Sequence, residues 1–287
     1  MLIIGFLLTA LVFFGHNLAN SLSMLFLFRG LAGIGVGVIP GSLSALAWGT
    51  PLGVFTGIGA LGFTLGNFLS GALKNDFLIF TTSALFCFAA FIISFFVKEE
   101  KKQISIPLFP YQIIMKNWRV YVPFLIRHSA AQAIWAIFPI YLIGLGANKF
   151  QIGVMYALNP FAQFIFMLIF DKYKSYRLIK IGTFFSTLTF LGYAISPKWQ
   201  YILFLQILLG LSWGSLYLGS LKSLLENNLE QATSTGILSS VIGLAGILGP
   251  LVGGLICLLG LRQLLFASAL LAAVAFLISW KYTKTAY

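Results

Sequence analysis

Long apolar runs, separated by short polar or turn-prone breaks, dominate the pattern along this chain. Most of the runs approach the roughly 20 residues that an α-helix needs to cross the hydrocarbon of a bilayer. The pattern predicts about ten membrane-spanning helices, over residues 2–14, 22–46, 52–73, 77–97, 118–145, 152–170, 178–195, 199–221, 235–259 and 264–280. We therefore expect an all-α, polytopic membrane protein.

Composition supports a membrane environment and argues against a soluble one. Apolar residues make up 60% of the 287 residues and charged residues only 8%, which is too little polar surface to solvate a soluble domain. Cys87 and Cys257 lie in separate apolar segments without the spacing of a metal site or a disulfide framework, so we interpret both as core residues. No cofactor or metal ion is predicted. The first segment begins at Met1 with no basic stretch before it, which favours a membrane helix over a cleaved signal peptide.

The formal net charge of +12 is unevenly divided between the two sides of the predicted membrane. Twelve Lys and Arg residues lie in the breaks on one side, and only four, namely Lys74, Lys149, Lys198 and Arg262, lie on the other. This asymmetry is typical of the positive-inside rule and predicts a multi-pass plasma-membrane protein with both termini in the cytoplasm. The excess positive charge then indicates topology and contact with anionic lipid headgroups, and not nucleic acid.

One long polar connection, residues 98–117, interrupts the series of helices and contains Pro107 and Pro110. It is expected to be a cytoplasmic loop between an N-terminal bundle of four helices, residues 1–97, and a C-terminal bundle of six helices, residues 118–287. The predicted halves are therefore unequal by two helices.

The chain also repeats itself with a period of six segments. Its first part can be laid over its second part with glycines in register: Gly5 on Gly182, Gly33 on Gly210, Gly37 on Gly214, Gly53 on Gly236, Gly66 on Gly249 and Gly71 on Gly254. The first segment thus matches the seventh, which predicts a parent architecture of six plus six helices whose opening pair is absent here. A complete ten-helix protein of two five-helix repeats would match the first segment to the sixth.

Glycines at helical spacing predict close helix packing. Gly33, Gly37 and Gly41 recur every fourth residue, so they are expected to form one flat seam that lets a neighbouring backbone approach. The same is expected of two further sets, Gly62 with Gly66, and Gly249 with Gly253 and Gly254. Such seams serve either as static bundle contacts or as surfaces on which helices slide.

Three segments resemble motifs of the major facilitator superfamily of secondary transporters. Residues 29–37, Arg-Gly-Leu-Ala-Gly-Ile-Gly-Val-Gly, are similar to the fourth-helix motif of that family. Residues 249–254, Gly-Pro-Leu-Val-Gly-Gly, are similar to its antiporter signature, but Asn67 replaces proline in the matching first-half stretch, so antiport is not implied. Asp171 and the basic residues after it partly match the motif of its cytoplasmic loops, without the motif's glycines.

The resemblance implies the family's helices three to twelve, without the first two, and transport of a small solute by alternating access around a midplane site. It also places Asp171, Lys172 and Arg177 in the loop between helices eight and nine. We expect these three residues either to form a gating contact that holds the halves closed to the cytoplasm or to be an ordinary solvated basic loop.

Polar residues inside the helices that resemble the family's helices four, seven, eight and ten are candidates for a solute site. On a helical wheel they gather on one face of each helix. The candidate substrate-binding residues are Arg29, Arg127, His128, Gln132, Trp135, Asn159, Gln163, Gln206, Trp213 and Tyr217. Each of them could instead have a structural role in the core.

No acidic residue lies inside a predicted span, whereas Arg29 and Arg127 do. The hypothesis that follows is an anionic or carbonyl-rich solute. A membrane enzyme acting on lipid substrates would show carboxylate pairs or histidine clusters, which the sequence lacks, so catalysis is not predicted. The same pattern of segments is compatible with a complete ten-helix drug/metabolite-type transporter and with a remnant that no longer transports.

Overall fold

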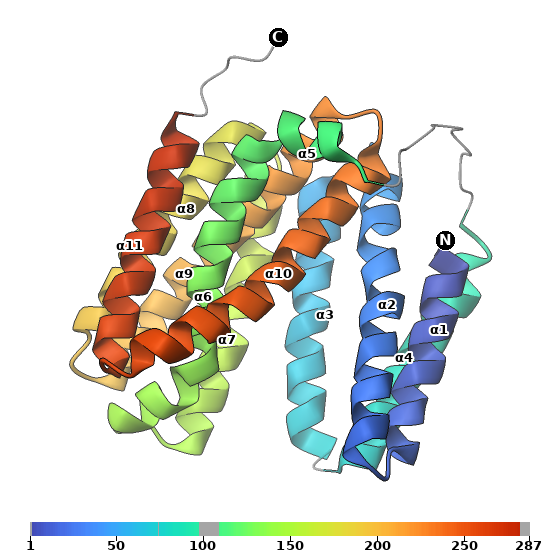
Figure 1. Cartoon of the computed structure of the whole chain (residues 1–287), viewed down its shortest axis with the longest axis horizontal. Helices are drawn as coiled ribbons and strands as arrows, with labels where there is room; N and C mark the ends of the chain where they lie inside the picture. Colours follow the sequence, from blue (N-terminus) through green and yellow to red (C-terminus); the bar gives the residue numbers. More distant parts are fainter. Residues whose placement is uncertain (1, 74, 98–108, 282–287) are drawn as a thin grey trace.

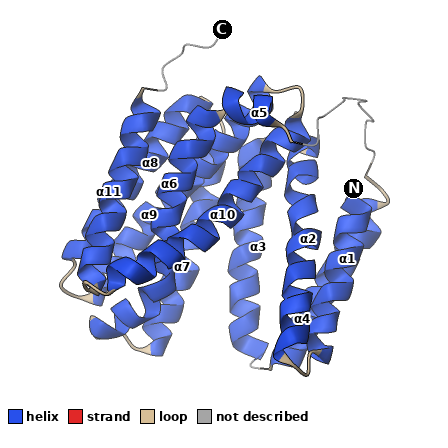
Figure 2. Ribbon diagram, viewed as in Figure 1, coloured by secondary structure: helices blue, strands red, loops and turns tan. Residues whose placement is uncertain are grey.

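The computed structural model describes residues 2–73, 75–97 and 109–281, and every regular element in these ranges is a helix (Figures 1 and 2). The elements are α1 (Leu2–Gly15), the 3-10 turn η1 (His16–Leu18), α2 (Leu22–Leu46), α3 (Leu52–Leu73), α4 (Asp76–Ser94), α5 (Tyr111–Lys116), α6 (Trp118–Gly144), α7 (Lys149–Phe170), α8 (Ser175–Ile195), α9 (Trp199–Asn227), α10 (Gln231–Cys257) and α11 (Leu261–Trp280). Each predicted segment corresponds to one long helix. Most of the connection predicted as a loop, including Lys98, Lys101 and Lys102, lies outside the described residues.

Eight of the described helices are long and apolar enough to cross a membrane, namely α2, α3, α4 and α7 to α11. Of the other two long helices, α1 is shorter, and α6 is more polar because it includes Arg127 and His128. Both run alongside the spanning helices (Figure 1). A polar helix is tolerated at this depth because its neighbours shield it from lipid.

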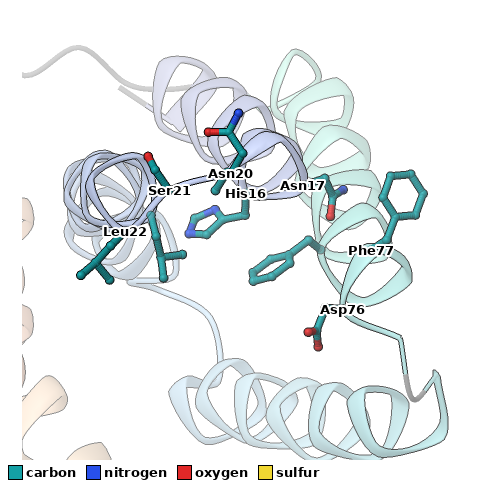
Figure 3. Close-up of a pocket in the computed structure, with 10 residues that line it drawn as sticks. His16, Asn17, Asn20, Ser21, Leu22, Asp76 and Phe77 are labelled. Carbon is teal, nitrogen blue, oxygen red and sulfur yellow. The ribbon is translucent and has the colours of Figure 1, made fainter.

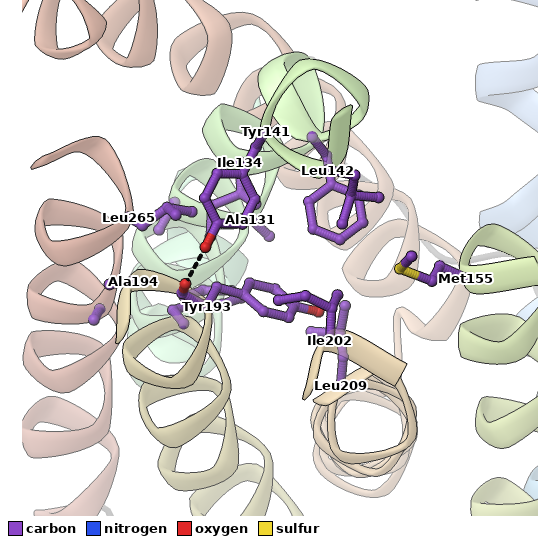
Figure 4. Close-up of a cluster of buried hydrophobic side chains, with 14 of the residues drawn as sticks. Ala131, Ile134, Tyr141, Leu142, Met155, Tyr193, Ala194, Ile202, Leu209 and Leu265 are labelled. Carbon is purple, nitrogen blue, oxygen red and sulfur yellow. Dashed lines mark hydrogen bonds between the residues drawn. The ribbon is translucent and has the colours of Figure 1, made fainter. Parts of the chain in front are cut away.

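The C-terminal group, α5 to α11, packs around α6 and α9. Helix α6 lies against α10 and α11, and α9 lies against α7 and α8. A core of large side chains closes one end of this group, where the Tyr141 hydroxyl donates a hydrogen bond to the Tyr193 carbonyl (Figure 4). Leu142 and Ile202 are fully buried beside them.

The N-terminal group, α1 to α4, is held together less evenly. Helix α1 packs against both α2 and α4, whereas α3 lies mainly against α7 of the C-terminal group (Figure 1). Helix α2 lies against α10. The second half of α3, from Leu61 onward, has no buried residue among those whose exposure the structure describes.

The internal repeat is visible as a repeated helix contact. A methyl group added at Gly5 of α1 would lie 2.9 Å from Ile39 of α2, and one added at Gly182 of α8 would lie 2.6 Å from Leu216 of α9. The glycine register that aligns Gly5 with Gly182 also aligns Ile39 with Leu216. The pairs α1–α2 and α8–α9 therefore use equivalent positions for one of their close approaches.

A hydrogen bond repeats in the same register. The Thr9 hydroxyl donates to the Gly5 carbonyl at 2.7 Å, and the Ser186 hydroxyl donates to the Gly182 carbonyl at 2.7 Å. These small polar side chains return to their own helix and leave a flat surface for the neighbouring helix.

The predicted seam on α2 is wrong over most of its length. Only Gly41 is in close contact, with a methyl group there meeting Gly236 of α10 at 3.1 Å, whereas nothing lies within 4 Å at Gly33 or Gly37. Helix α1 instead approaches Gly35, on a different face, because Thr9 packs there. The spacing of glycines along a helix shows which face carries no side chains, but it does not show whether another helix packs on that face.

Of the other two predicted seams, the one at Gly62 and Gly66 is wrong, and the one on α10 is confirmed at Gly249 and Gly253 but not at Gly254. Gly62, Gly66 and Gly254 have open space around them. Gly249 and Gly253, by contrast, press α10 against Ala133 of α6, with added methyl groups at 2.9 Å from its nitrogen and 2.8 Å from its Cβ.

Candidate functional site

The N-terminal and C-terminal groups meet through a hydrogen bond between Gly53 and Asp171. Gly53 is the second residue of α3, and its backbone N–H donates to Asp171 Oδ1 at 2.6 Å. N–H groups in the first turn of a helix have no partner within the helix, and a carboxylate satisfies them while complementing the helix dipole. A side chain at position 53 would collide with the Met167 carbonyl and with Asp171 Cβ, so only glycine permits this approach.

Hydrogen bonds from Lys222 of α9, which was not among the predicted site residues, hold the segment that contains Asp171. Lys222 Nζ donates to the carbonyl oxygens of Asp171, at 2.8 Å, and Tyr173, at 3.2 Å. The other two predicted gating residues lie differently, because Lys172 and Arg177 are exposed and face the rings of their neighbours Tyr173 and Tyr176. Of the three, only Asp171 joins the two groups in the described contacts.

A second contact between the groups lies at the same end of the molecule. The Thr235 hydroxyl, at the start of α10, donates to the Gly41 carbonyl of α2 at 3.2 Å. Farther along the same helices, added methyl groups at Gly37 and Gly59 would meet nothing within 4 Å. The close approaches between the groups are therefore concentrated at the end where α2 finishes and α3 begins.

Arg127 is the largest fully buried side chain of the described residues, with 1% of its surface exposed. Its Nε donates to the Ser186 hydroxyl at 2.6 Å and one terminal nitrogen donates to the Ser212 hydroxyl at 3.2 Å. Its guanidinium also lies 5.4 Å from the ring centroid of Phe190 and 5.3 Å from that of Trp213. The carboxylates of the described residues all lie at helix ends or in turns, so this buried charge is held by hydroxyls and aromatic faces.

Next to Arg127, three rings form a stack that links α6 to α9. His128 stacks on Trp213, with centroids 4.7 Å apart, and Trp213 stacks on Tyr217 at 5.7 Å. The His128 Nε2 atom lies 3.1 Å from the Gln132 amide nitrogen, and the buried Nδ1 atom has no partner in the described part of the chain. The stack is half-buried at Trp213 and Tyr217, so this face combines aromatic surface with unfilled hydrogen-bonding capacity.

The other predicted residues of the C-terminal group lie around this centre. Asn159 accepts a hydrogen bond from Gln163 at 3.0 Å on α7, close to where α9 packs through Gly210. Gln206 is completely buried, and neither atom of its amide has a hydrogen-bond partner among the described residues. Trp135 belongs to a different cluster, in which it packs on Tyr156 at 5.2 Å.

Arg29 lies in the N-terminal group, away from this centre. The Arg29 side chain is exposed. Gly33 lies one turn farther along the same face of α2, and a methyl group added there would have nothing within 4 Å. Arg29 therefore lies on a face of α2 that has no close neighbour at Gly33 or Gly37.

Sequence analysis missed the residues that support Arg127 from other helices. Ser186 and Phe190 are one turn apart on α8, and Ser212 lies on α9. Their only signal in the sequence is the set of small polar residues within apolar segments, which does not show what they contact. Lys222 was visible only as one more cation on the basic side.

Comparison with known proteins identifies the fold. No family model matches the sequence, and no curated protein sequence matches it. The structure is similar to the crystal structure of the human organic anion transporter MFSD10 (TETRAN), with a TM-score of 0.83 and 16% sequence identity. The match covers 97% of this chain and 76% of that chain. At the level of the fold, the resemblance to major facilitator superfamily transporters is confirmed.

Proposed function

We propose that this protein transports a small organic anion across the plasma membrane by alternating access, with residues 1–97 and 118–287 as the two moving parts. The observation that carries the proposal is the concentration of contacts between these parts at one end. The Gly53–Asp171 hydrogen bond and the approach of Gly41 to Gly236 both lie there, and Gly57 of α3 still packs on Phe164, whereas Gly37 of α2 and Gly59 of α3 are open. Two parts that rock around a central site must be in contact at one end and separated from each other elsewhere.

The end that is closed carries the basic loops. Lys172 and Arg177 follow Asp171 directly, and the positive-inside rule assigns their side to the cytoplasm. The proposed state is therefore closed to the cytoplasm, with both termini on that side. In the alternate state the Gly53–Asp171 bond would be broken, while Lys172 and Arg177 would remain at the headgroup boundary.

The proposed charge of the solute rests on Arg127. Among the described residues, carboxylates lie only at helix ends or in turns, and two hydroxyls are the only hydrogen-bond acceptors of Arg127. A buried cation without a counter-ion creates a positive potential in a medium of low dielectric constant, which favours an anion near the His128–Trp213–Tyr217 stack. The similar structure is named as that of an organic anion transporter, which agrees with this assignment.

The side chains that we propose to contact the solute are chosen by how exposed each of them is. The half-buried residues Gln132, Trp213 and Tyr217 would touch the solute, and His128, whose Nδ1 is buried without a partner in the described residues, would support them from behind. Arg127 would act from behind the stack, because its own surface is covered. Asn159, Gln163, Gln206 and Trp135 would line the adjoining faces of the C-terminal group, and Arg29 the opposite wall.

The test is uptake of radiolabelled benzoate into liposomes that contain the purified protein. Arg127→Met should lower the initial rate roughly tenfold or more, since hydrogen bonds and attraction to a charged group contribute about 1.5–3 kcal/mol. Arg119→Met is the matched control, because Arg119 is an exposed residue on the same helix that lies over Trp118. Absence of uptake for benzoate and for a panel of other organic anions, in protein that remains folded, would refute the proposal.

A further inference from the structure

A cavity of about 520 Å³ lies in the N-terminal group (Figure 3). All of its lining residues belong to α2, α4 and the turn between α1 and α2, and none of them belongs to the Arg127 centre. It is open to the outside and is bordered by the turn between α1 and α2 and by the first turn of α4, at the opposite end from the Gly53–Asp171 contact. Its polar lining residues are His16, Asn17, Asn20, Ser21 and Asp76. The volume is in the range of sites for small ligands.

His16 presents an unfilled hydrogen-bond acceptor in this lining. Its side chain is 5% exposed, and Nδ1 lies 2.8 Å from the Val12 carbonyl oxygen. A carbonyl can only accept, so Nδ1 carries the proton and Nε2 of the neutral ring is an acceptor. Nε2 is buried and has no partner within the described ranges. The ring is fixed by stacking on Phe80, with centroids 4.8 Å apart and planes at 14°.

Asp76 is the one charged side chain among the residues that line the cavity. It is the first residue of α4, is exposed, and has no hydrogen-bond partner among the described residues. Asn17 adds a further acceptor, because its amide nitrogen is used to donate to Thr81 at 2.9 Å and its carbonyl oxygen is left over. The groups without partners thus include a carboxylate and two neutral acceptors, beside the Asn20 amide, which can accept as well as donate.

We propose that this cavity binds an ammonium group. One N–H would donate to Nε2 of His16, the positive charge would be paired with Asp76, and the ring of Phe80 would supply apolar and cation–π contact. The ammonium could belong to a soluble amine or to the headgroup of an aminophospholipid, since both present the same donors. This site is independent of anion transport, because it lies in the other group of helices and is tested by binding.

Isothermal titration calorimetry with 2-phenylethylamine tests the proposal. The full chain is purified in detergent, without ethanolamine lipid, for this titration. The neutral isostere 2-phenylethanol should bind at least about tenfold more weakly. Asp76→Asn and His16→Phe should each weaken amine binding about tenfold, the second while keeping an aromatic ring against Phe80. Asp76 is exposed, so its variant remains informative even where His16→Phe fails to fold.

Glu230→Gln is the matched control, because Glu230 is also a carboxylate at a helix start, that of α10, at the other end of the molecule. It should leave amine binding unchanged. Equal affinity for the amine and the alcohol, or unchanged binding in both Asp76→Asn and His16→Phe, would overturn the proposal.

The two sources are separated by repeating the titration in nanodiscs. If phosphatidylethanolamine competes with 2-phenylethylamine and phosphatidylcholine, which has no N–H donor, does not, then the site takes a lipid headgroup. If neither lipid competes and the amine still binds, then the site takes a soluble amine. If both lipids compete equally, the N–H donors play no part and the proposal fails.

Discussion

Asp171 and Gly53 belong to different groups of helices, and the carboxylate of Asp171 caps the first turn of the helix that contains Gly53. The bond joins a charged acceptor to a helix N-terminus, where the aligned peptide dipoles favour negative charge. Because the donor is a backbone N–H group, the strength of the hydrogen bond depends on how closely the start of α3 approaches the end of α7. The missing side chain at Gly53 is therefore as important as the charge of Asp171.

The first prediction concerns Gly53→Ala, which should open the end of the molecule where the two groups meet. Loss of a charge-assisted hydrogen bond of about 1.5–3 kcal/mol should shift the populations of closed and open states roughly tenfold or more. Spin labels at Trp48→Cys and Lys174→Cys, in protein with Cys87 and Cys257 replaced by serine, report the separation. Double electron–electron resonance should show a longer and broader distance distribution for Gly53→Ala.

Gly59→Ala provides the control for that experiment. It makes the same chemical change on the same helix, but nothing lies within 4 Å of the added methyl group. Gly59→Ala raises helix propensity at least as much as Gly53→Ala, so a longer distance in Gly53→Ala alone reports the contact with Asp171. The same distance distribution in both variants would show that the contact does not hold the groups together.

A second prediction concerns the support of the buried arginine. Ser186→Ala removes the acceptor 2.6 Å from Arg127 Nε and leaves a charged donor without a partner, which should lower the free energy of unfolding by about 1–3 kcal/mol. Ser240→Ala should change it by less than about 0.5 kcal/mol, because Ser240 is exposed and bonds only to a carbonyl one turn back. Unfolding in detergent micelles, followed by circular dichroism, measures both. Equal stability of the two variants would mean that other groups support Arg127.

The helices could be predicted from the sequence because each spanning segment is a long apolar run and each break contains turn residues. Even the weakest boundary, between residues 46 and 52, proved to be a turn, in which Gly49 takes a φ of +94°. The face of α6 with Arg127, His128 and Gln132 also followed from helical geometry alone. The structure brings Arg127 and His128 against Trp213 of α9, on which Tyr217 stacks, and Gln132 contacts His128.

Contacts between distant helices could not be predicted in the same way. Gly33 and Gly37 have the spacing of a packing seam, but a spacing does not reveal whether a neighbour is present. The partner of Asp171 is a backbone amide, which has no signature of residue type. Ser186 and Ser212 are common small residues of membrane helices, and only the fold shows that they meet at one guanidinium.

A third prediction tests the orientation in the membrane. Lys174 lies in the turn between α7 and α8, and Lys198 lies in the turn between α8 and α9, at the opposite end of the bundle. Both are exposed. In intact cells a membrane-impermeant maleimide should label Lys198→Cys, whereas Lys174→Cys should be labelled only after permeabilisation. The reverse pattern would place the Asp171 contact on the outside and contradict the proposed orientation.

The last prediction concerns Trp213, which is in contact with both the buried cation and the half-buried stack. Its ring lies 5.3 Å from the Arg127 guanidinium and 4.7 Å from the His128 ring, so it separates the charge from the aromatic face. Trp213→Ala should raise the KM for benzoate about threefold to tenfold, since a stacked aromatic pair contributes about 0.5–1.5 kcal/mol. Trp213→Phe should preserve most of the affinity, and Trp280→Ala, an exposed tryptophan at the end of α11, should have no effect. The KM is measured in liposomes that contain equal amounts of folded protein. An unchanged KM in Trp213→Ala would place the solute site away from the stack, because no other half-buried ring of the described residues contacts both His128 and Tyr217.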